Sequence, residues 1–312
     1  MTFDTEDIIS PRAIEILNLL LEKLKKHDFK ALFFITGNMA ERLSAYPQTI
    51  DLLREHEIGY HSSGHSIHPT IFEFTDVENY EAAYQISTIR ETSHIDPLTG
   101  KVGPQGGLLS LKSLFPSKQI VAFRAPGCCW SPPHLEALRD LGIKFDFSSS
   151  IYPEPFSYKN LTFYPYPNLG DWRNKSSYYR LFLLSIIRNR VTIADLHPSS
   201  LLNKEDWDSI YWKGNPRALV AVPAKEDSET SMLLKTFGSF LKRAKYLEKI
   251  GLIQTTPNLK ESHKHISITS EDVIKCYQHS IRWPKRLFEY EPKYLRNHFF
   301  KFFNLPISNE AT

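Results

Sequence analysis

The stretch KALFFITG (residues 30–37) is followed by SAYPQTIDLLREH (residues 44–56) and then by EIGYHS (residues 57–62). The first segment is short, apolar and rich in aromatic and branched residues, so it predicts a buried strand. The second has apolar residues at helical spacing, and the third is again short and apolar. A helix between two buried strands predicts a βαβ unit, in which the two strands run parallel.

The same alternation continues in both directions. MTFD (residues 1–4) predicts a strand, and residues 11–28 predict a helix in which apolar side chains recur every three or four positions. A long helix is expected at residues 231–250, and the Gly- and Pro-rich segment Ile95–Gly107 predicts a loop. Further strands are expected in QIVAFRAPG (119–127), IKFDFSS (143–149), LTFYPYP (161–167), VTIADLHP (191–198) and GLIQTTP (251–257).

Six to eight such units fit into residues 1–257, which is the scale of a (β/α) barrel of the α/β class. An open, doubly wound sheet is the alternative. Residues 258–312 lack strand alternation and predict helices broken by prolines. We therefore expect a barrel over residues 1–257 and a helical C-terminal extension over residues 258–312.

Composition excludes several classes of protein. Of 312 residues, 41% are hydrophobic and 23% charged, as in ordinary globular proteins, and the net charge of +3 is spread along the chain, which argues against a nucleic-acid partner. Three cysteines, two of them adjacent, do not make a disulfide framework. No apolar run of about 18 residues is present. Acidic residues from Asp4 onward do not fit a signal peptide, so a cytoplasmic location is expected.

Ionisable residues follow the predicted strands at their carboxyl ends. Since these ends share one rim in a parallel barrel, their side chains are expected to meet there and to form an active site. The residues are Asp4, Glu6, Asp7, His61, His65, Arg124, Asp146 and His197.

Two imidazoles four residues apart, His61 and His65, together with a carboxylate from another strand, form a three-ligand site for a divalent metal with open positions for water and substrate. A second carboxylate can accept a proton from the water, and a histidine on the opposite wall can protonate a leaving group. An arginine can hold the base carboxylate in its ionised form. Taken singly, each motif also fits a capping, surface or core role, and Cys128–Cys129 fits packing alone; the joint placement favours an enzyme.

Several motifs, in this order, resemble those of polysaccharide deacetylases of the NodB homology type (carbohydrate esterase family 4). The resemblance covers about residues 2–257 and implies a distorted seven-stranded barrel. The motifs are TFDTED (2–7), KALFFITGNMAERL (30–43), HEIGYHSSGH (56–65), AFRAPG (122–127) and ADLHP (194–198).

The resemblance implies Asp4 as general base, His61 and His65 as metal ligands, Arg124 as the residue that orients Asp4, and His197 as general acid. Many family members have two adjacent aspartates where this chain has Thr5 between Asp4 and the next acids. The third ligand is therefore left open between Glu6 and Asp7. Zn²⁺ is the expected metal, with Co²⁺, Ni²⁺ and Mn²⁺ as alternatives.

The residues expected to bind the substrate are His68, Pro126, Gly127, Trp130 and Asp146, and for His68 a position behind the metal ligands is the alternative. Many members carry tyrosine-glycine where this chain has Gly127 and Cys128, and the backbone N–H groups there are expected to contribute to an oxyanion hole, a role that needs no side chain. Asp146 is the carboxylate expected to raise the pKa of His197.

The expected reaction is metal-dependent removal of an N-acetyl group from an amino sugar in a polysaccharide, oligosaccharide or lipid-linked glycan. A deformylase or cyclic-amide hydrolase on the same fold, or a non-catalytic carbohydrate-binding member, are the alternatives. RWPKRLFEYEPKYLRNHFFKFF (282–303) interleaves six Lys or Arg with aromatics, and LFLLSII (181–187) is a short apolar run. Both suggest peripheral contact with a membrane or a lipid-linked substrate; a helix packed on the barrel is the alternative.

Overall fold

The computed structural model has a nine-stranded sheet at its centre, with strand order β10-β11-β1-β2-β3-β6-β7-β9-β8. It describes residues 1–149, 152–165, 168–169, 175–188, 191–214, 216–255, 257, 259–262, 266–287 and 289–307. The strands of this sheet are β1 (Thr2–Thr5), β2 (Leu32–Ile35), β3 (Glu57–Tyr60), β6 (Ala122–Phe123), β7 (Phe145–Asp146), β8 (Phe156–Tyr158), β9 (Leu161–Phe163), β10 (Asn168–Leu169) and β11 (Ala194–Leu196).

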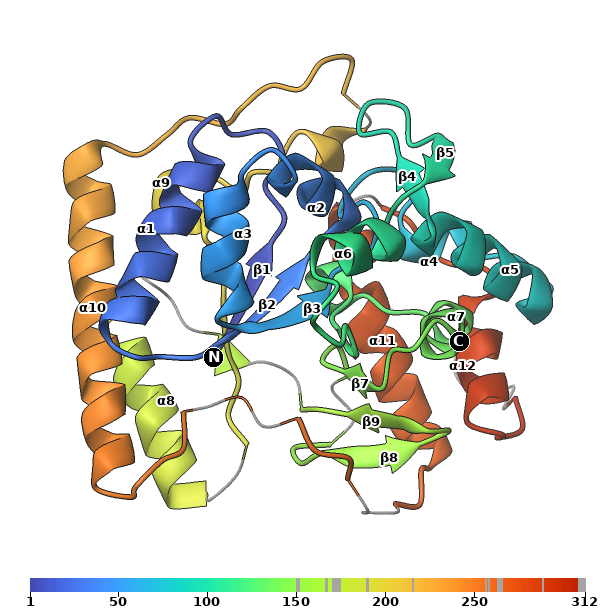
Figure 1. Cartoon of the computed structure of the whole chain (residues 1–312). Helices are drawn as coiled ribbons and strands as arrows, with labels where there is room; N and C mark the ends of the chain where they lie inside the picture. Colours follow the sequence, from blue (N-terminus) through green and yellow to red (C-terminus); the bar gives the residue numbers. More distant parts are fainter. Residues whose placement is uncertain are drawn as a thin grey trace.

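Every neighbouring pair in this sheet is parallel except β8 and β9. The sheet curls around itself (Figure 1). This confirms the predicted distorted barrel of the α/β class, with eight parallel strands among the described residues in place of seven. Because the strands are parallel, the carboxyl ends of β1, β3, β6 and β11 lie on one rim.

Helices cover the outside of the sheet, with α1, α3 and α10 on one side and α11 and α12 on another (Figure 1). The helices are α1 (Ala13–Lys26), α2 (Gly37–Leu43), α3 (Pro47–Arg54), α4 (Ile71–Phe74), α5 (Tyr80–Glu91), α6 (Leu108–Leu114), α7 (Pro132–Asp140), α8 (Lys175–Arg188), α9 (Ser199–Leu202), α10 (Asp227–Lys249), α11 (Ser270–Leu287) and α12 (Leu295–Phe302), with short 3₁₀ turns η1 (Pro126–Cys128) and η2 (Tyr211–Lys213).

The core explains the register of the first strands. Phe3 of β1 stacks on Phe33 of β2 with ring centroids 4.8 Å apart, and Phe237 of α10 meets Phe3 edge-on at 6.2 Å. All three side chains are fully buried. The parallel pairing of Phe3 with Phe33 places Asp4 opposite Phe34, one position before β1 reaches the rim.

Two local predictions differ from the structure, and one helix was not predicted. Ile95–Gly107 is not a loop throughout, because β5 (Val102–Gln105) pairs antiparallel with β4 (Ser93–Ile95) in a separate hairpin. The described residues of GLIQTTP contain no strand. A separate helix, α2, follows β2 directly, because the Thr36 hydroxyl accepts the Met39 N–H at 3.1 Å and caps it.

The C-terminal segment is helical, as predicted, and packs on the barrel. Trp130 and Phe299 are both fully buried, with ring centroids 4.8 Å apart, and Phe302 lies edge-on to Trp130 at 6.1 Å. The aromatic side chains of α12 that suggested membrane contact are therefore buried in the core. The boundary at residues 257 and 258 stays a prediction.

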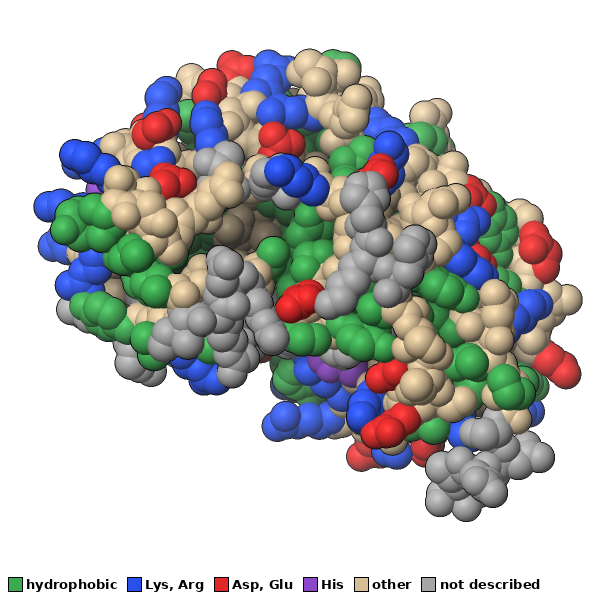
Figure 2. Space-filling view, turned by 90° about the horizontal axis from the view of Figure 1, so that it is seen from below, with side chains coloured by type: hydrophobic (Ala, Val, Ile, Leu, Met, Phe, Trp, Pro, Cys, Tyr) green, Lys and Arg blue, Asp and Glu red, His purple; other side chains and the backbone are tan. Residues whose placement is uncertain are grey.

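No helix in the described part of the chain is both long and apolar enough to cross a membrane. The face seen from below shows basic and acidic side chains interspersed around its edge with hydrophobic ones between them (Figure 2). No single sign of charge dominates this face.

Candidate metal and catalytic site

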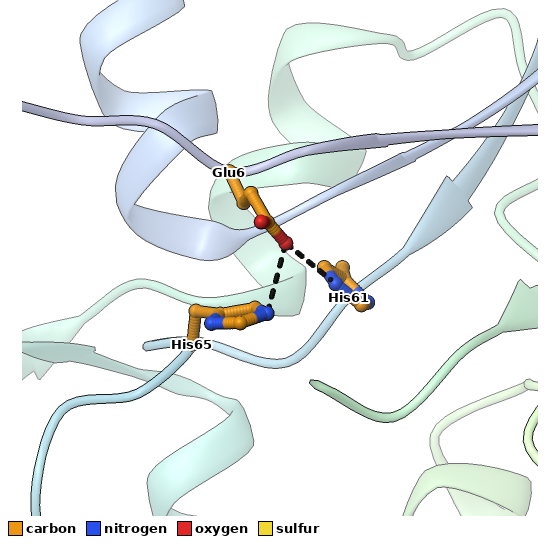
Figure 3. Close-up of side chains that lie close together, drawn as sticks. All are labelled: Glu6, His61 and His65. Atoms are coloured by element: carbon orange, nitrogen blue, oxygen red, sulfur yellow. Dashed lines mark hydrogen bonds and ion pairs between the residues drawn. The ribbon is translucent and has the colours of Figure 1, made fainter. Parts of the chain in front are cut away.

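Glu6, His61 and His65 converge at the rim of the barrel (Figure 3). Glu6 follows β1, and the two histidines lie in the loop that follows β3. The Glu6 Oε2 atom is 3.0 Å from His61 Nε2 and 2.8 Å from His65 Nε2. One ligand atom from each residue lies within 4.8 Å of the other two. The spacing fits a single divalent ion.

The other nitrogen of each imidazole shows which atoms can bind a cation. His61 Nδ1 is 2.7 Å from the carbonyl oxygen of Arg124, which only accepts, so Nδ1 carries the proton. His65 Nδ1 is 2.8 Å from Ser66 Oγ, whose hydroxyl donates to Asp208. When the imidazoles are neutral, the Nε2 lone pair of each therefore faces the Glu6 carboxylate. Lone pairs repel a carboxylate, so a proton or a metal ion must lie between them.

Side chains outside this triad hold it in place. Trp207 Nε1 donates to Glu6 Oε1 at 2.7 Å, which leaves Glu6 Oε2 facing the histidines. His65 Nδ1 is also 3.2 Å from Asp208 Oδ2. A carboxylate behind a ligand histidine fixes its tautomer and raises its basicity. Burial disfavours charge on His65, but Glu6 and Asp208 outweigh it and raise the pKa of His65 to about 10.

Glu6, and not Asp7, points at the histidines. Asp7 Oδ1 accepts the backbone N–H groups of Ile9 at 3.0 Å and Ser10 at 2.9 Å, and its Oδ2 accepts from Asn203 Nδ2 at 3.1 Å. These contacts tie the turn after β1 to the region of α9. The alternative in which Asp7 is the ligand does not fit this geometry, since both of its oxygens are engaged elsewhere.

Arg124 at the end of β6 joins two carboxylates from neighbouring strands. Its Nη1 donates to Asp4 Oδ1 at 2.7 Å and also contacts Asp195 Oδ1, while Nη2 donates to Thr2 Oγ1 at 2.8 Å. The guanidinium lies 4.4 Å from the ring centroid of Phe34 and is fully buried. The contact between Arg124 and Asp4 that the resemblance implies is therefore present.

The second oxygen of Asp4 faces the histidines. Asp4 Oδ2 is 3.7 Å from His61 Nε2 and 3.7 Å from His197 Nε2. The His197 side chain is 38% exposed, whereas that of Asp4 is 5% exposed. Asp4 thus has one oxygen held by Arg124 and the other beside the proposed metal position, with His197 across from it.

The carboxylates around His197 set its charge. The protein around the partly exposed His197 removes some of its hydration and so lowers its pKa, but Glu6, Asp195 and Asp4 outweigh this and raise it above its ordinary value. Burial opposes ionisation of Glu6 in the same way, and His65, His61 and His197 reverse this and hold its pKa well below its usual range. The main carboxylates that raise the pKa of His197 are thus Glu6, Asp195 and Asp4, and not Asp146, which was expected in this role.

A cavity of about 560 Å³ opens onto these side chains. Asp4, Glu6, His65 and His197 line it, as do Pro126 and Gly127 from η1. The expected oxyanion contribution of the next N–H does not fit, because Cys128 N donates to the Ala125 carbonyl at 2.8 Å inside the η1 turn.

Three expected substrate-facing residues lie elsewhere. His68 binds Glu73 through Nδ1 at 2.8 Å and the Tyr211 carbonyl through Nε2 at 3.0 Å. Trp130 is buried against α12. Asp146 accepts the backbone N–H of Ser148 at 3.1 Å and its hydroxyl at 2.8 Å, and burial raises its pKa to about 6. None of the three lines the cavity, so their side chains contact other parts of the protein and do not face a substrate there.

The loop that carries the histidines is anchored from behind by Glu91 at the end of α5. Glu91 Oε2 accepts the Ser63 N–H at 2.9 Å and the Tyr60 hydroxyl, and Oε1 accepts the Ser62 hydroxyl at 3.0 Å. His134 Nε2 lies 2.9 Å from the same Oε1. Glu91 is 1% exposed, so the structure holds a buried charge behind the two ligand histidines.

The sequence did not single out Asp195, Trp207, Asp208 or Glu91. Asp195 had a usable signal. It lies on β11, two residues before His197, which directly follows the strand, and two-residue spacing in extended chain points side chains to the same face. The other three come from a helix or from loops far along the chain, and no local pattern marks them.

No family model and no curated protein matches the chain. Solved structures that resemble it include a carbohydrate esterase family 4 (CE4) esterase from Streptococcus mutans, with 15% identity over 80% of this chain and 81% of that one and a TM-score of 0.43. The Xyl-CE4 domain of a multidomain xylanase from the hindgut metagenome of Trinervitermes trinervoides has 16% identity over 84% and 94% of the two chains and a TM-score of 0.34.

A CE4 family pseudoenzyme from Bacillus anthracis has 15% identity with this chain over 81% of it, with a TM-score of 0.36. The match spans 62% of the length of that pseudoenzyme. At these identities and TM-scores the likenesses assign neither an activity nor a substrate to this chain.

Proposed function

We propose that this chain is a metal-dependent hydrolase of the polysaccharide deacetylase type, which removes an N-acetyl group from an amino sugar of a glycan. The observation that carries the proposal is the convergence of Glu6 Oε2 with the Nε2 atoms of His61 and His65, next to a second carboxylate and a histidine on one cavity. The motifs TFDTED, HSSGH and ADLHP support the same assignment.

The donor set fits a divalent ion of the zinc type. Two imidazole nitrogens and one carboxylate oxygen are the ligand types of catalytic zinc sites, which keep further positions open. Such an ion, when bound, supplies a Lewis acid and lowers the pKa of a water molecule to about 7. Glu6, His61 and His65 would hold it, and Trp207 and Asp208 would fix the orientation of Glu6 and His65.

Asp4 is proposed as the general base. Its Oδ1 is bound by Arg124, so the free direction of the carboxylate is Oδ2, which lies beside His61 Nε2 and the cavity. Asp4 Oδ2 can accept a proton from the attacking water. Arg124 restricts the rotation of this carboxylate, because the same guanidinium also binds Asp195 and Thr2.

His197 is proposed as the general acid. It lines the cavity across from Asp4, and the carboxylates around it keep it protonated to a higher pH than an ordinary histidine. In the reaction, the amide C–N bond breaks and a C–O bond to the water oxygen forms. The proton from His197 goes to the departing amine nitrogen, and acetate is released with the free amino sugar.

The experiment that tests this function is acetate release from β-linked N-acetylhexosamine oligomers, measured together with the metal content of the purified protein. One equivalent of divalent metal and stoichiometric release of acetate and amine are expected. Treatment with a chelator should abolish the activity, and Zn²⁺ or Co²⁺ should restore it.

The competing functions give different products. Formate release from the N-formyl analogue, with no acetate from the N-acetyl oligomer, identifies a deformylase. Ring opening of a cyclic amide, with no acid released from either oligomer, identifies a cyclic-amide hydrolase. Binding of oligomers with a full metal site and no product identifies a carbohydrate-binding member. Any of these results contradicts the proposed reaction.

A further inference from the structure

One wall of the catalytic cavity comes from outside the barrel strands. Trp283, Pro284, Arg286 and Leu287 of α11 line the same cavity as Asp4, Glu6 and His197. Trp283, Arg286 and Leu287 stand at positions i, i+3 and i+4, which lie on one face of a helix. The chain therefore presents a helix face, about 280 residues after the base, to the proposed reaction centre.

The indole of Trp283 lies directly against the turn next to Arg124. A Cβ atom at Gly127 would be only 3.3 Å from Trp283 Cδ1, and the φ of +57° at Gly127 is itself one that favours glycine. The absence of a side chain at this position is what allows the indole to approach η1. Trp283 is partly buried and packs against the core, so its ring is placed by its surroundings.

The helix that carries Trp283 is fixed at both ends. Near its start, Asp272 accepts from the Tyr152 hydroxyl at 3.2 Å. Beyond its end, Asp76 accepts the Tyr290 hydroxyl at 2.8 Å and the backbone N–H of Tyr294 at 2.6 Å, at the start of α12. Since α12 is itself packed against Trp130, this wall of the cavity is held in place by the core.

The chemistry of this wall fits a sugar ring. A pyranose has an apolar C–H face, which suits an indole, and a rim of hydroxyl groups, which suits hydrogen-bond donors. The guanidinium of Arg286 lies 5.7 Å from the Trp283 ring centroid and lines the cavity beside it. The cavity, at about 560 Å³, also exceeds what an acetamide group alone requires.

We propose that Trp283, with Arg286 beside it, is a sugar-binding platform through which α11 selects a glycan over a small acyl compound. This inference rests on the proposed function, because it places a sugar unit of the substrate next to the reacting amide. Trp283 acts in binding and takes no part in proton transfer.

The test compares Trp283→Ala, Trp283→Phe and the control Lys285→Ala, an exposed residue on the same helix that does not line the cavity. Affinity for a β-linked N-acetylhexosamine tetramer is measured by calorimetry, and kcat and KM are measured for the tetramer and for 4-nitrophenyl acetate, which has no sugar. Trp283→Ala should weaken tetramer binding and raise its KM about tenfold, with kcat little changed. Trp283→Phe should retain most of the wild-type affinity for the tetramer.

The outcomes separate this inference from the proposed function. If the tetramer binds in a way that depends on Trp283 but is not hydrolysed, the proposed reaction is wrong and the sugar-binding platform is supported. If Trp283→Ala hydrolyses the tetramer with the KM of the wild type, the proposed reaction is supported and the sugar-binding platform is overturned. Equal loss on both substrates, or an unchanged affinity in Trp283→Ala, also overturns it, as does a wild-type protein that does not bind the tetramer. Thermal melts of all variants identify any that fail to fold.

Discussion

The carboxylate of Glu91 on α5 holds the backbone of Ser63, whose N–H it accepts at 2.9 Å. Ser63 lies midway between His61 and His65, so a buried charge on a helix sets the path of the loop that carries both histidines. The same carboxylate also receives the Ser62 hydroxyl at 3.0 Å. The relative position of the two histidines therefore depends on a residue that lies outside the cavity lining.

Glu91→Gln should weaken metal binding about 10- to 100-fold, the usual range for changes behind ligand residues. The amide keeps one acceptor oxygen but cannot accept all four of the donors that meet the carboxylate. Zn²⁺ affinity by competition with a chelating dye measures the effect. Glu81→Gln, on the exposed first turn of the same helix, is the matched control and should bind Zn²⁺ as the wild type does.

Glu6→Gln should lose the bound metal, whereas Asp7→Asn should retain it. Glu6 supplies the oxygen that faces both imidazoles, while both Asp7 oxygens are engaged in the turn after β1. Metal content by atomic emission after gel filtration distinguishes the two variants. The double variant His61→Ala/His65→Ala should contain no metal; full occupancy in it, or in Glu6→Gln, contradicts the assigned ligand set.

Activity should fall on the alkaline side as His197 loses its proton. Its pKa is raised by Glu6, Asp195 and Asp4, so the protonated, active form is complete below its folded-state pKa and is lost as pH rises through it. The alkaline limb of kcat/KM is therefore expected above about pH 6.5, the ordinary histidine value. His197→Ala should remove this limb and lower the rate about 10²- to 10⁴-fold.

Asp195→Asn should move the same limb to lower pH, because it removes one of the carboxylates that stabilise the protonated imidazole. The pH profile is the readout, since a purely structural effect changes the rate without moving the limb. Asp227→Asn, whose side chain is 82% exposed at the start of α10, is the control and should leave the limb in place. An unmoved limb in Asp195→Asn removes Asp195 from this role.

Phe299→Ala should lower the free energy of unfolding by about 3–5 kcal/mol, the usual cost of removing a buried aromatic side chain. Phe299 is fully buried and packs on Trp130, so its loss leaves a cavity between α12 and the barrel. Urea denaturation measures the change. Met232→Ala, at a side chain 57% exposed on α10, is the control and should change stability by less than about 0.5 kcal/mol.

Much of the fold and the proposed site follows from local sequence patterns. Strand and helix periodicity predicted β1, α1, β2, β3 and α10, because each buries a continuous apolar face. The carboxyl ends of the strands share one rim in a parallel barrel, and this predicted that residues separated by up to about 190 positions would meet there. The hairpin β4–β5 was missed, since its second strand, Val102–Gln105, is wholly exposed and its Gly and Pro content predicts a loop.

Other features depend on tertiary structure alone. Whether Glu6 or Asp7 faces the histidines is decided by hydrogen bonds from Ser10 and Asn203, and the latter is about 200 residues away. The partners Trp207 and Glu91, and the wall formed by Trp283, meet the site only through packing of distant helices and loops. Local sequence determined which residue types reach the rim, because strand periodicity is a short-range property. The direction of each side chain and its neighbours depend on contacts between segments that no periodicity encodes.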